Sequence, residues 1–192
     1  KQSSQRKRIP TICELGKYVF GSSWRGGKHL DLLNDKLHQL INGKIKRLAI
    51  MMPPRHAKTT LSCQLFVPVY LAQHPDKRII YTTYQADKAA EWGRKSRDVI
   101  DQFSSMLGIT VRSDSRASNS WNIAGSRGGM LTAGQGGPLV GSGADVLICD
   151  DLLKNNEEAD SPVMREKLVD WLGSTAFTRL EPDAAVIMIM HR

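Results

Sequence analysis

Short apolar runs alternate along this chain with longer segments of helical periodicity, and this alternation restricts the fold more than any other feature. Four runs rich in β-branched or other apolar residues predict strands, at residues 48–52, 78–84, 146–149 and 184–190. Helical periodicity before and between them predicts helices at residues 30–41, 59–72 and 87–106. The pattern favours an α/β fold with a mostly parallel central sheet and helices on both faces.

Prolines and glycines refine this pattern. Pro53 and Pro54 cannot continue a paired strand, so the first strand is expected to end at Met52. Pro68 is expected to interrupt or bend the helix that it falls in. Two further β-like runs, at residues 120–124 and 129–133, flank a glycine-containing turn and predict a hairpin.

The composition is typical of one folded domain. The 192 residues are 41% hydrophobic and 24% charged, which excludes a disordered chain. No apolar run approaches the roughly 20 residues that span a bilayer, and the start "KQSSQRKR" lacks the apolar segment of a signal peptide, so we expect no membrane partner and an intracellular location. The net charge of +8 favours a polyanionic partner, although many basic proteins bind no nucleic acid. Cys13, Cys63 and Cys149 lack metal-ligand spacing and are expected to be buried thiols.

The segment "MMPPRHAKTT", residues 51–60, is similar to a phosphate-binding loop without its glycines. It has the required context, because a strand precedes it and a predicted helix N-terminus, which attracts phosphate, follows it. Lys58 would neutralise phosphate charge and the Thr59 hydroxyl would bind Mg²⁺. The prolines have no N–H to donate, so backbone contacts to phosphate fall to Arg55, His56, Ala57, Lys58, Thr59 and Thr60, and Arg55 can add a charge-assisted donor. The alternative is a chance Lys-Thr pair before a helix.

A second motif, "DVLICDD", has the layout of a Walker B strand. Asp150 can bind Mg²⁺, and Asp151 can orient or deprotonate the attacking water. The alternative is a buried strand that ends in a polar turn. Ligands of open α/β sheets gather at the carboxyl ends of the strands, so both motifs are expected to face one crevice.

The spacing of the two motifs distinguishes between branches of nucleotide-hydrolysing proteins. Asp150 lies 92 residues after Lys58, and the predicted strand at residues 78–84 falls between them in the sequence. An additional strand and a second, catalytic acid are typical of mechanical ATPases and not of nucleotide kinases. The expected fold is therefore a P-loop NTPase of the additional-strand, catalytic-glutamate type.

Four segments together resemble the ATPase domain of the large terminase subunit of tailed double-stranded DNA phages: "GKIKRLAIMMPPRHAKTTL", "ADVLICDDLLKNNEEADSP", "WLGSTAFTRLEP" and "VIMIMHR". The likeness runs from about Gly16 to the end of the chain, and a glycine-poor loop is ordinary in one branch of that family. It implies a basic N-terminal tail (residues 1–15) and an ATPase domain (residues 16–192). Full-length members carry a C-terminal nuclease domain, which we expect to be absent from these 192 residues.

The resemblance also implies an activity and partners. Such a motor hydrolyses ATP with Mg²⁺ and moves double-stranded DNA into a procapsid, in the cytoplasm of the host. It assembles as a homo-oligomeric ring, a pentamer in the family, on the portal protein, together with a small terminase subunit. Lys58 and Thr59 match the Walker A positions, Asp150 the metal-binding carboxylate and Asp151 the catalytic one.

Asp151 departs from the pattern of the many relatives with Glu at this position. Asp is about 1.5 Å shorter, so Glu157 and Glu158 stay as alternative bases. His191 and Arg192 fall where the coupling motif of the family follows the last strand. That motif is incomplete here, so neither residue is given a role.

Members of this family often carry a glutamine upstream of the loop, and this glutamine hydrogen-bonds the edge of the adenine. His29, 29 residues before Lys58, is the nearest match, with Trp24 or Phe20 as stacking partners. A histidine at a helix start is, however, more often a capping or solvated residue.

Candidates for an arginine finger from a neighbouring subunit are Arg127, Arg116 and Arg179, while Arg55 could act within its own subunit. The segment 141–143, where some relatives carry an arginine, reads "GSG". Two basic clusters could contact DNA phosphates, although each is more often a solvated face: Lys88, Arg94, Lys95 and Arg97 on the long helix, and Arg6, Lys7 and Arg8 in the tail.

Two other functions fit parts of the sequence. A helicase-like mechanical ATPase would use the same loop and acids, but no helicase motif set is found. A non-catalytic basic DNA-binding scaffold with a decayed loop would bind no ATP.

Overall fold

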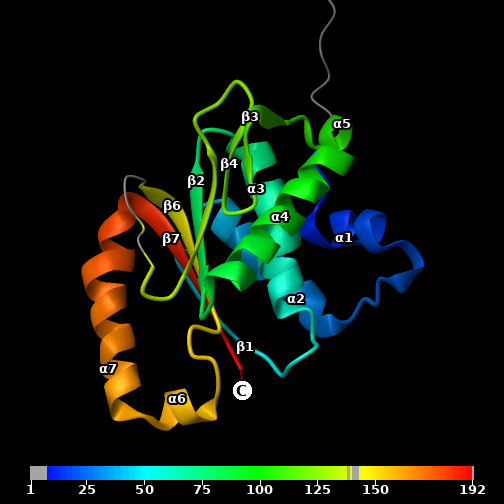
Figure 1. Cartoon of the computed structure of the whole chain (residues 1–192). Helices are drawn as coiled ribbons and strands as arrows, with labels where there is room; N and C mark the ends of the chain where they lie inside the picture. Colours follow the sequence, from blue (N-terminus) through cyan, green and yellow to red (C-terminus); the bar gives the residue numbers. More distant parts are fainter. Residues whose placement is uncertain (1–7, 138, 140–142, 192) are drawn as a thin grey trace, which may run out of the picture.

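The structure, a computed structural model, describes residues 8–137, 139 and 143–191. Seven strands form one mixed sheet in the order β1-β7-β6-β2-β5-β4-β3, with helices on both of its faces (Figure 1). The strands are β1 (Arg47–Met51), β2 (Arg78–Thr83), β3 (Val111–Ala117), β4 (Ser120–Ile123), β5 (Gly129–Gly134), β6 (Ala144–Asp150) and β7 (Leu180–Met190). All four strands predicted from the alternating pattern are present.

The first five strands of this order run parallel to one another, and β4 and β3 add an antiparallel part at one edge. The predicted hairpin exists as β4 and β5. Strand β3 was not expected, because only Val111 is buried in its sequence "VRSDSRA" and no apolar alternation marks it. The sheet is therefore mixed, with the parallel part that the alternation predicts.

The strand between β1 and β6 in the sheet is β7. The strand that lies between the two motifs in the sequence, β2, pairs with β6 on its other side. Sequence order therefore does not give the spatial order here, although one additional strand does separate β1 from β6.

The larger core lies on the face of the sheet that the first helices cover. These are α1 (Ile12–Phe20), α2 (Lys28–Ile41), α3 (Phe66–Gln73), α4 (Ala86–Gln102) and the short α5 (Ser104–Leu107). Their apolar sides pack with inward-facing residues of the sheet such as Tyr81 and Ile148. The predicted helix 59–72 begins with a π-helical turn, Thr60–Leu65, and its irregularity therefore precedes Pro68, which cannot donate to the carbonyl one turn earlier.

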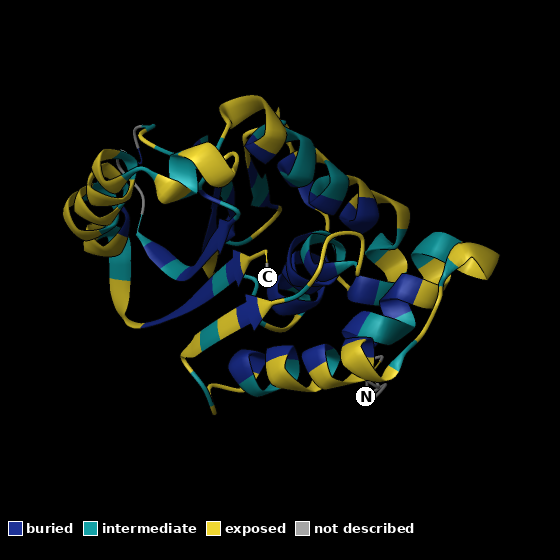
Figure 2. Ribbon diagram, turned by 90° about the horizontal axis from the view of Figure 1, so that it is seen from below, coloured by how far each residue is buried: buried dark blue, intermediate teal, exposed yellow. Residues whose placement is uncertain are grey.

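The opposite face carries a smaller core of residues such as Leu147 and Val186. It is covered by α7 (Pro162–Trp171), which follows α6 (Asn156–Asp160) and continues into a π-helical turn, Leu172–Ala176. None of the residues of α7 is fully buried, and Figure 2 shows this helix as mostly exposed at the side of the sheet.

Helix α1 begins at Ile12, within residues 1–15, the range that the resemblance implied to be a basic tail. Thr11 caps it in a reciprocal capping box with Glu14, and Ile12 and Leu15 are fully buried. Of the basic tail cluster, Arg6 and Lys7 lie outside the described residues, and Arg8 pairs with Glu14. No helix in the described part of the chain is long and apolar enough to cross a membrane.

Candidate functional site

The carboxyl ends of β1, β6 and β7 meet at one edge of the sheet, which Figure 2 views from below. Met51, the last residue of β1, pairs with Met190 of β7, and Asp150 of β6 pairs with Ile189. The N–H of Asp151 donates to the carbonyl of Ile189 (3.0 Å). The loop after β1, the two acids after β6 and the residue after β7 therefore lie beside one another.

The loop after β1 has the backbone of a phosphate cradle without glycine. Arg55 (φ 63°) and Ala57 (φ 56°) occupy the left-handed region, and His56 between them does not. Such alternation turns successive N–H groups toward one side of the chain, as in anion-binding nests. The backbone N–H groups of Arg55, His56 and Ala57 donate no hydrogen bond to a described residue. A left-handed residue other than glycine costs about 1–2 kcal/mol, and such strain is typical of functional sites.

Lys58 begins the helical segment and is held in a triangle of polar contacts. Its Nζ lies 3.3 Å from Oδ2 of Asp151 and 2.6 Å from Nδ1 of His191. Nε2 of His191 lies 2.9 Å from the same Asp151 oxygen. The lysine is 6% exposed, so this charge is paired in a largely dry environment. The structure thus brings Lys58 and Asp151 together, 93 residues apart in the chain.

The contacts of His191 define its tautomer. A lysine ammonium has only donors, so Nδ1 of His191 accepts from Lys58. Nε2 is then the nitrogen that donates a hydrogen bond to Asp151. The imidazole ring in this arrangement links the lysine and the carboxylate, and it holds the carboxylate in one orientation. Arg192, the other residue of the incomplete coupling motif, lies outside the described residues.

Asp150 is 3% exposed, and its two carboxylate oxygens differ. Oδ2 accepts a hydrogen bond from the Tyr81 hydroxyl (2.9 Å), while Oδ1 has no partner among the described residues. Burial raises the pKa of this carboxyl, and the hydroxyls of Thr59 and Tyr81 partly offset the effect. Thr59 forms no hydrogen bond of good geometry with this carboxylate, and Oδ1 stays without a partner among the described residues.

Thr59 and Asp150 fit an Mg²⁺ ion that also binds phosphate. The orphaned, buried Oδ1 of Asp150 is an acceptor that a cation or its water would satisfy. No group of three or more His, Cys, Asp or Glu side chains in the described ranges could hold a metal by itself. Mg²⁺ commonly binds through one or two protein ligands, waters and substrate phosphates, which is the kind of site that these two residues can complete.

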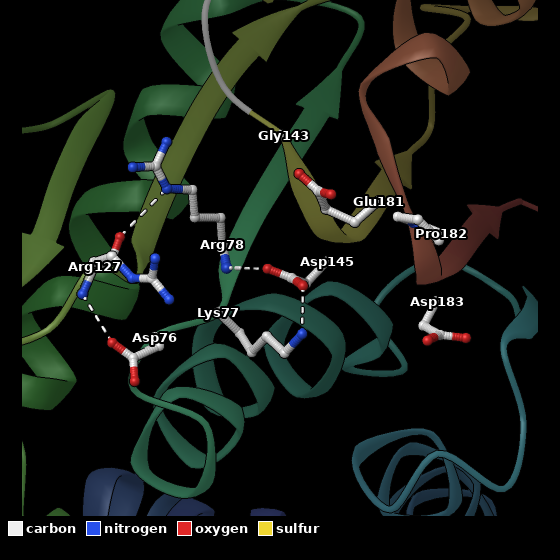
Figure 3. Close-up of a pocket in the computed structure, with 9 residues that line it drawn as sticks. All are labelled: Asp76, Lys77, Arg78, Arg127, Gly143, Asp145, Glu181, Pro182 and Asp183. Carbon is white, nitrogen blue, oxygen red and sulfur yellow. Dashed lines mark hydrogen bonds and ion pairs between the residues drawn. The ribbon is translucent and has the colours of Figure 1, made fainter.

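Asp151 has φ 44°, a third left-handed residue at this edge. A cavity of about 500 Å³ borders it, lined by Pro54, His191 and apolar side chains that include Leu152 and Met188. A hollow of similar size, about 520 Å³, lies at the opposite edge of the sheet, where Lys77 pairs with Asp145 (Figure 3). That second hollow lies at the amino ends of β2 and β6, whereas the acids and the loop after β1 lie at the carboxyl ends of the strands.

Of the upstream residues expected near adenine, His29 lies beside the loop and Trp24 packs against α1. His29, exposed in the first turn of α2, lies edge to face with His56 of the loop, with ring centroids 5.6 Å apart. Trp24 stacks on Phe20 at 5.9 Å and packs against Gly16, where a Cβ would meet its ring at 2.6 Å. His29 therefore borders the loop, and the packing of Trp24 is directed into α1.

The alternative bases contact none of the three residues in the triangle. Oε2 of Glu158 accepts from the backbone N–H of Lys154 (2.8 Å), and its own N–H is capped by Asn155. Glu157 is exposed in the first turn of α6. Asp151 is thus the acid that lies against Lys58.

The candidate finger arginines are distant from this edge of the same chain. Arg127 follows β4 and lies beside Arg78, at the amino end of β2 (Figure 3). Arg179 directly precedes β7, so it also lies at the amino end of its strand. Arg116 of β3 pairs with Asp101. Residues 141 and 142 lie outside the described residues.

Three of the four basic side chains in the cluster on α4 pair with acids of the same helix. Lys88 and Lys95 both pair with Glu91 (3.2 and 2.8 Å), and Arg97 pairs with Asp98 (3.1 Å). This favours the solvated-face interpretation over a track for DNA. The expectation of buried thiols is confirmed for Cys63 and Cys149, and Cys13 is half-buried.

Two residues at the site were not given a role from the sequence. His191 lies two positions after Ile189, the residue of β7 that pairs with Asp150. Its contacts with Lys58 and Asp151 require β7 to lie between β1 and β6 in the sheet. Tyr81 of β2 reaches Asp150 across the sheet. A polar aromatic residue in the buried run "RIIYTTY" was the available signal, because a buried tyrosine hydroxyl requires a partner.

A protein-family model matches residues 49–192: the N-terminal part of the terminase large subunit of the T4likevirus type. A comparison with curated proteins found no match. The family match covers well over half of the chain and includes the loop, both acids and His191. The chain therefore belongs to the family of large terminase subunits, viral proteins of bacteriophage DNA packaging.

Proposed function

We propose that this chain is the ATP-hydrolysing motor domain of a phage terminase. The observation that supports this most is the meeting of Lys58, Asp151 and His191 beside the strained loop and the buried Asp150. The order β1-β7-β6-β2 also agrees with a P-loop NTPase that has an additional strand between the loop strand and the acidic strand. Packaging is favoured over a helicase role because of the family match.

In this proposal the backbone from Arg55 to Thr60 wraps the β- and γ-phosphates. The unpartnered N–H groups of the loop and the N-terminus of the following helix supply donors and a positive dipole end. The phosphates compete with Asp151 and His191 for the Lys58 ammonium. Arg55, whose side chain is exposed beside the loop, adds a planar set of donors.

Thr59 and Asp150 would hold Mg²⁺, which neutralises charge on the phosphates when bound. Asp151 accepts a proton from the water whose oxygen attacks the γ-phosphorus, and the bond between that phosphorus and the ADP oxygen breaks. His191 donates to one Asp151 oxygen, so the other stays available to the water. His29 is the candidate for the adenine edge, since it borders the loop.

The energy of hydrolysis would drive double-stranded DNA into a procapsid in the host cytoplasm. The proposed partners are DNA, the portal protein, the small terminase subunit and further copies of this chain in a ring, with five as the number in the family. The distant positions of Arg127 and Arg179 are compatible with a finger that acts on a neighbouring subunit and not on its own.

Two substitutions separate binding from hydrolysis. Lys58→Ala should lower both ATP affinity and phosphate release by at least about tenfold, because it removes the phosphate-facing charge. Asp151→Asn should abolish phosphate release and leave ATP affinity nearly unchanged, since its charge acts on water. Calorimetric ATP binding and a phosphate-release assay measure the two quantities, with Asp160→Asn in exposed α6 as the control.

Equal loss of binding and hydrolysis in Asp151→Asn would mean that this acid has a structural role only. Saturable ATP binding that persists unchanged in Lys58→Ala would place the nucleotide elsewhere. A wild-type chain that binds no ATP would contradict the proposal as a whole.

A further inference from the structure

Tyr81 is a fully buried residue of β2 whose hydroxyl donates to the carboxylate of Asp150 (2.9 Å). Within the sheet, Tyr81 pairs with Ile148 and Thr83 pairs with Asp150. Side chains alternate between the faces of a strand, so Tyr81, Ile148 and Asp150 share one face. The tyrosine ring thus lies one side-chain position before the acid and reaches diagonally to it.

Burying the Tyr81 hydroxyl costs free energy, and its hydrogen bond to Asp150 offsets that cost. A buried hydroxyl without a partner costs about 1–3 kcal/mol, and phenylalanine would fill the same space without that cost. Among the described residues, Asp150 is the hydrogen-bond partner of the Tyr81 hydroxyl. Packing alone therefore does not account for tyrosine at this position.

The contact also makes the two oxygens of Asp150 unequal. Oδ2 is occupied by the Tyr81 hydroxyl, and the buried Oδ1 has no partner among the described residues. A carboxylate that is fixed through one oxygen cannot rotate without the loss of that hydrogen bond. Its second oxygen then keeps one direction, and the Thr59 hydroxyl lies close enough to the same carboxyl to lower its pKa.

We propose that Tyr81 is a positioning residue for the metal-binding carboxylate: its hydroxyl fixes Asp150 so that Oδ1 is presented to the Mg²⁺ ion that accompanies the nucleotide. The inference rests on the proposed function. It adds a residue from β2, outside both sequence motifs, to the group that determines how strongly metal and nucleotide binding are coupled. Outer partners of metal-binding groups commonly change metal affinity by about 10–100-fold.

The test is the variant Tyr81→Phe, which keeps the ring and removes the hydroxyl. ADP affinity is measured by calorimetry with saturating Mn²⁺ and again in EDTA, and the ratio of the two affinities reports metal coupling. We expect this ratio to fall by about tenfold or more, while the affinity in EDTA stays at the wild-type value. The matched control is Tyr70→Phe, which removes a hydroxyl from another buried tyrosine, on α3.

A second readout keeps the hydroxyl of Tyr81. The chain contains four tyrosines, so labelling with 3-fluorotyrosine gives a simple ¹⁹F NMR spectrum. Addition of Mg²⁺ to the ADP complex should shift the resonance of Tyr81 and leave that of Tyr70 unchanged. This measurement does not depend on the folding of a variant.

The outcomes distinguish this inference from the proposed function. A wild-type chain without nucleotide binding would refute the proposed function. Wild-type coupling that persists in Tyr81→Phe, or an unmoved Tyr81 resonance, would overturn the positioning role alone. Equal loss of coupling in both tyrosine variants would assign the effect to core packing and also overturn it.

Discussion

The substitution Ala57→Gly tests whether the backbone of the loop is strained at Ala57, where a phosphate-binding loop usually has a glycine. Ala57 has φ 56°, a conformation that costs a residue with a Cβ about 1–2 kcal/mol and costs glycine almost nothing. Glycine also loses more conformational entropy on folding, by about 1 kcal/mol relative to alanine. The two effects together predict a free energy of unfolding that is unchanged or up to about 1 kcal/mol higher.

Ala90 provides a matched control in the interior of α4, since it is also half-buried but has an ordinary helical φ. Ala90→Gly should lower the free energy of unfolding by about 1 kcal/mol. The entropy of glycine and the loss of one half-buried methyl group are common to both variants. The difference between them should therefore equal the relieved strain, about 1–2 kcal/mol.

Urea unfolding followed by circular dichroism measures both variants under one set of conditions. For a chain of this size, a difference of about 1–2 kcal/mol also separates the two melting temperatures by about 2–8 °C. If Ala57→Gly destabilises the chain as much as Ala90→Gly, the loop is not strained at this residue. Backbone strain at Ala57 would then not be a mark of the proposed phosphate site.

Two further substitutions test the site and its support. Burial raises the pKa of Asp150, so the folded chain binds more protons there than the unfolded chain, and this carboxyl lowers stability as pH rises above its ordinary pKa of 3.8. Asp150→Asn should therefore raise the free energy of unfolding at pH 7 relative to wild type and remove that part of the pH dependence in urea titrations. A loss of stability in this variant at pH 7 would contradict the prediction. Gly93→Ala should lower stability by about 1–3 kcal/mol, because a Cβ there would lie 2.5 Å from the Ser118 carbonyl oxygen; thermal unfolding would instead show a gain if Gly93 were an ordinary helical glycine.

Much of the parallel sheet follows from local sequence, because inner strands such as β2 and β6 are buried on both faces and are therefore continuous apolar runs. Strand β1, at the edge of the sheet, has only Ile50 buried but is also a short apolar run. The segments that were missed have other signals. Helix α1 is short, but Thr11 and Glu14 form a capping box that is readable in the sequence. Helix α7 begins with Ser161 as cap and Pro162 in its first turn, although its apolar residues do not form a buried stripe.

The site was predictable to the extent that it depends on the direction of the strands. Lys58 and Asp151 both follow parallel strands, so their proximity follows from the rule that ligands gather at carboxyl ends. The contact of His191 requires β7 to lie between β1 and β6, and the spatial order of strands is not written in any local pattern. Likewise, the hydrogen bond of Tyr81 depends on the register of β2 against β6.

The central claim is that the loop and the two acids enclose one triphosphate and its metal ion. A crystal structure of the chain with a non-hydrolysable ATP analogue and Mn²⁺ tests it most directly, because the anomalous signal locates the metal independently. We predict the γ-phosphate within hydrogen-bond distance of Lys58 and the Mn²⁺ directly bound to the Thr59 hydroxyl, with Asp150 bound directly or through one water. A metal peak beyond reach of both Thr59 and Asp150, or an analogue bound in the hollow beside Arg78 at the opposite edge of the sheet, would contradict it.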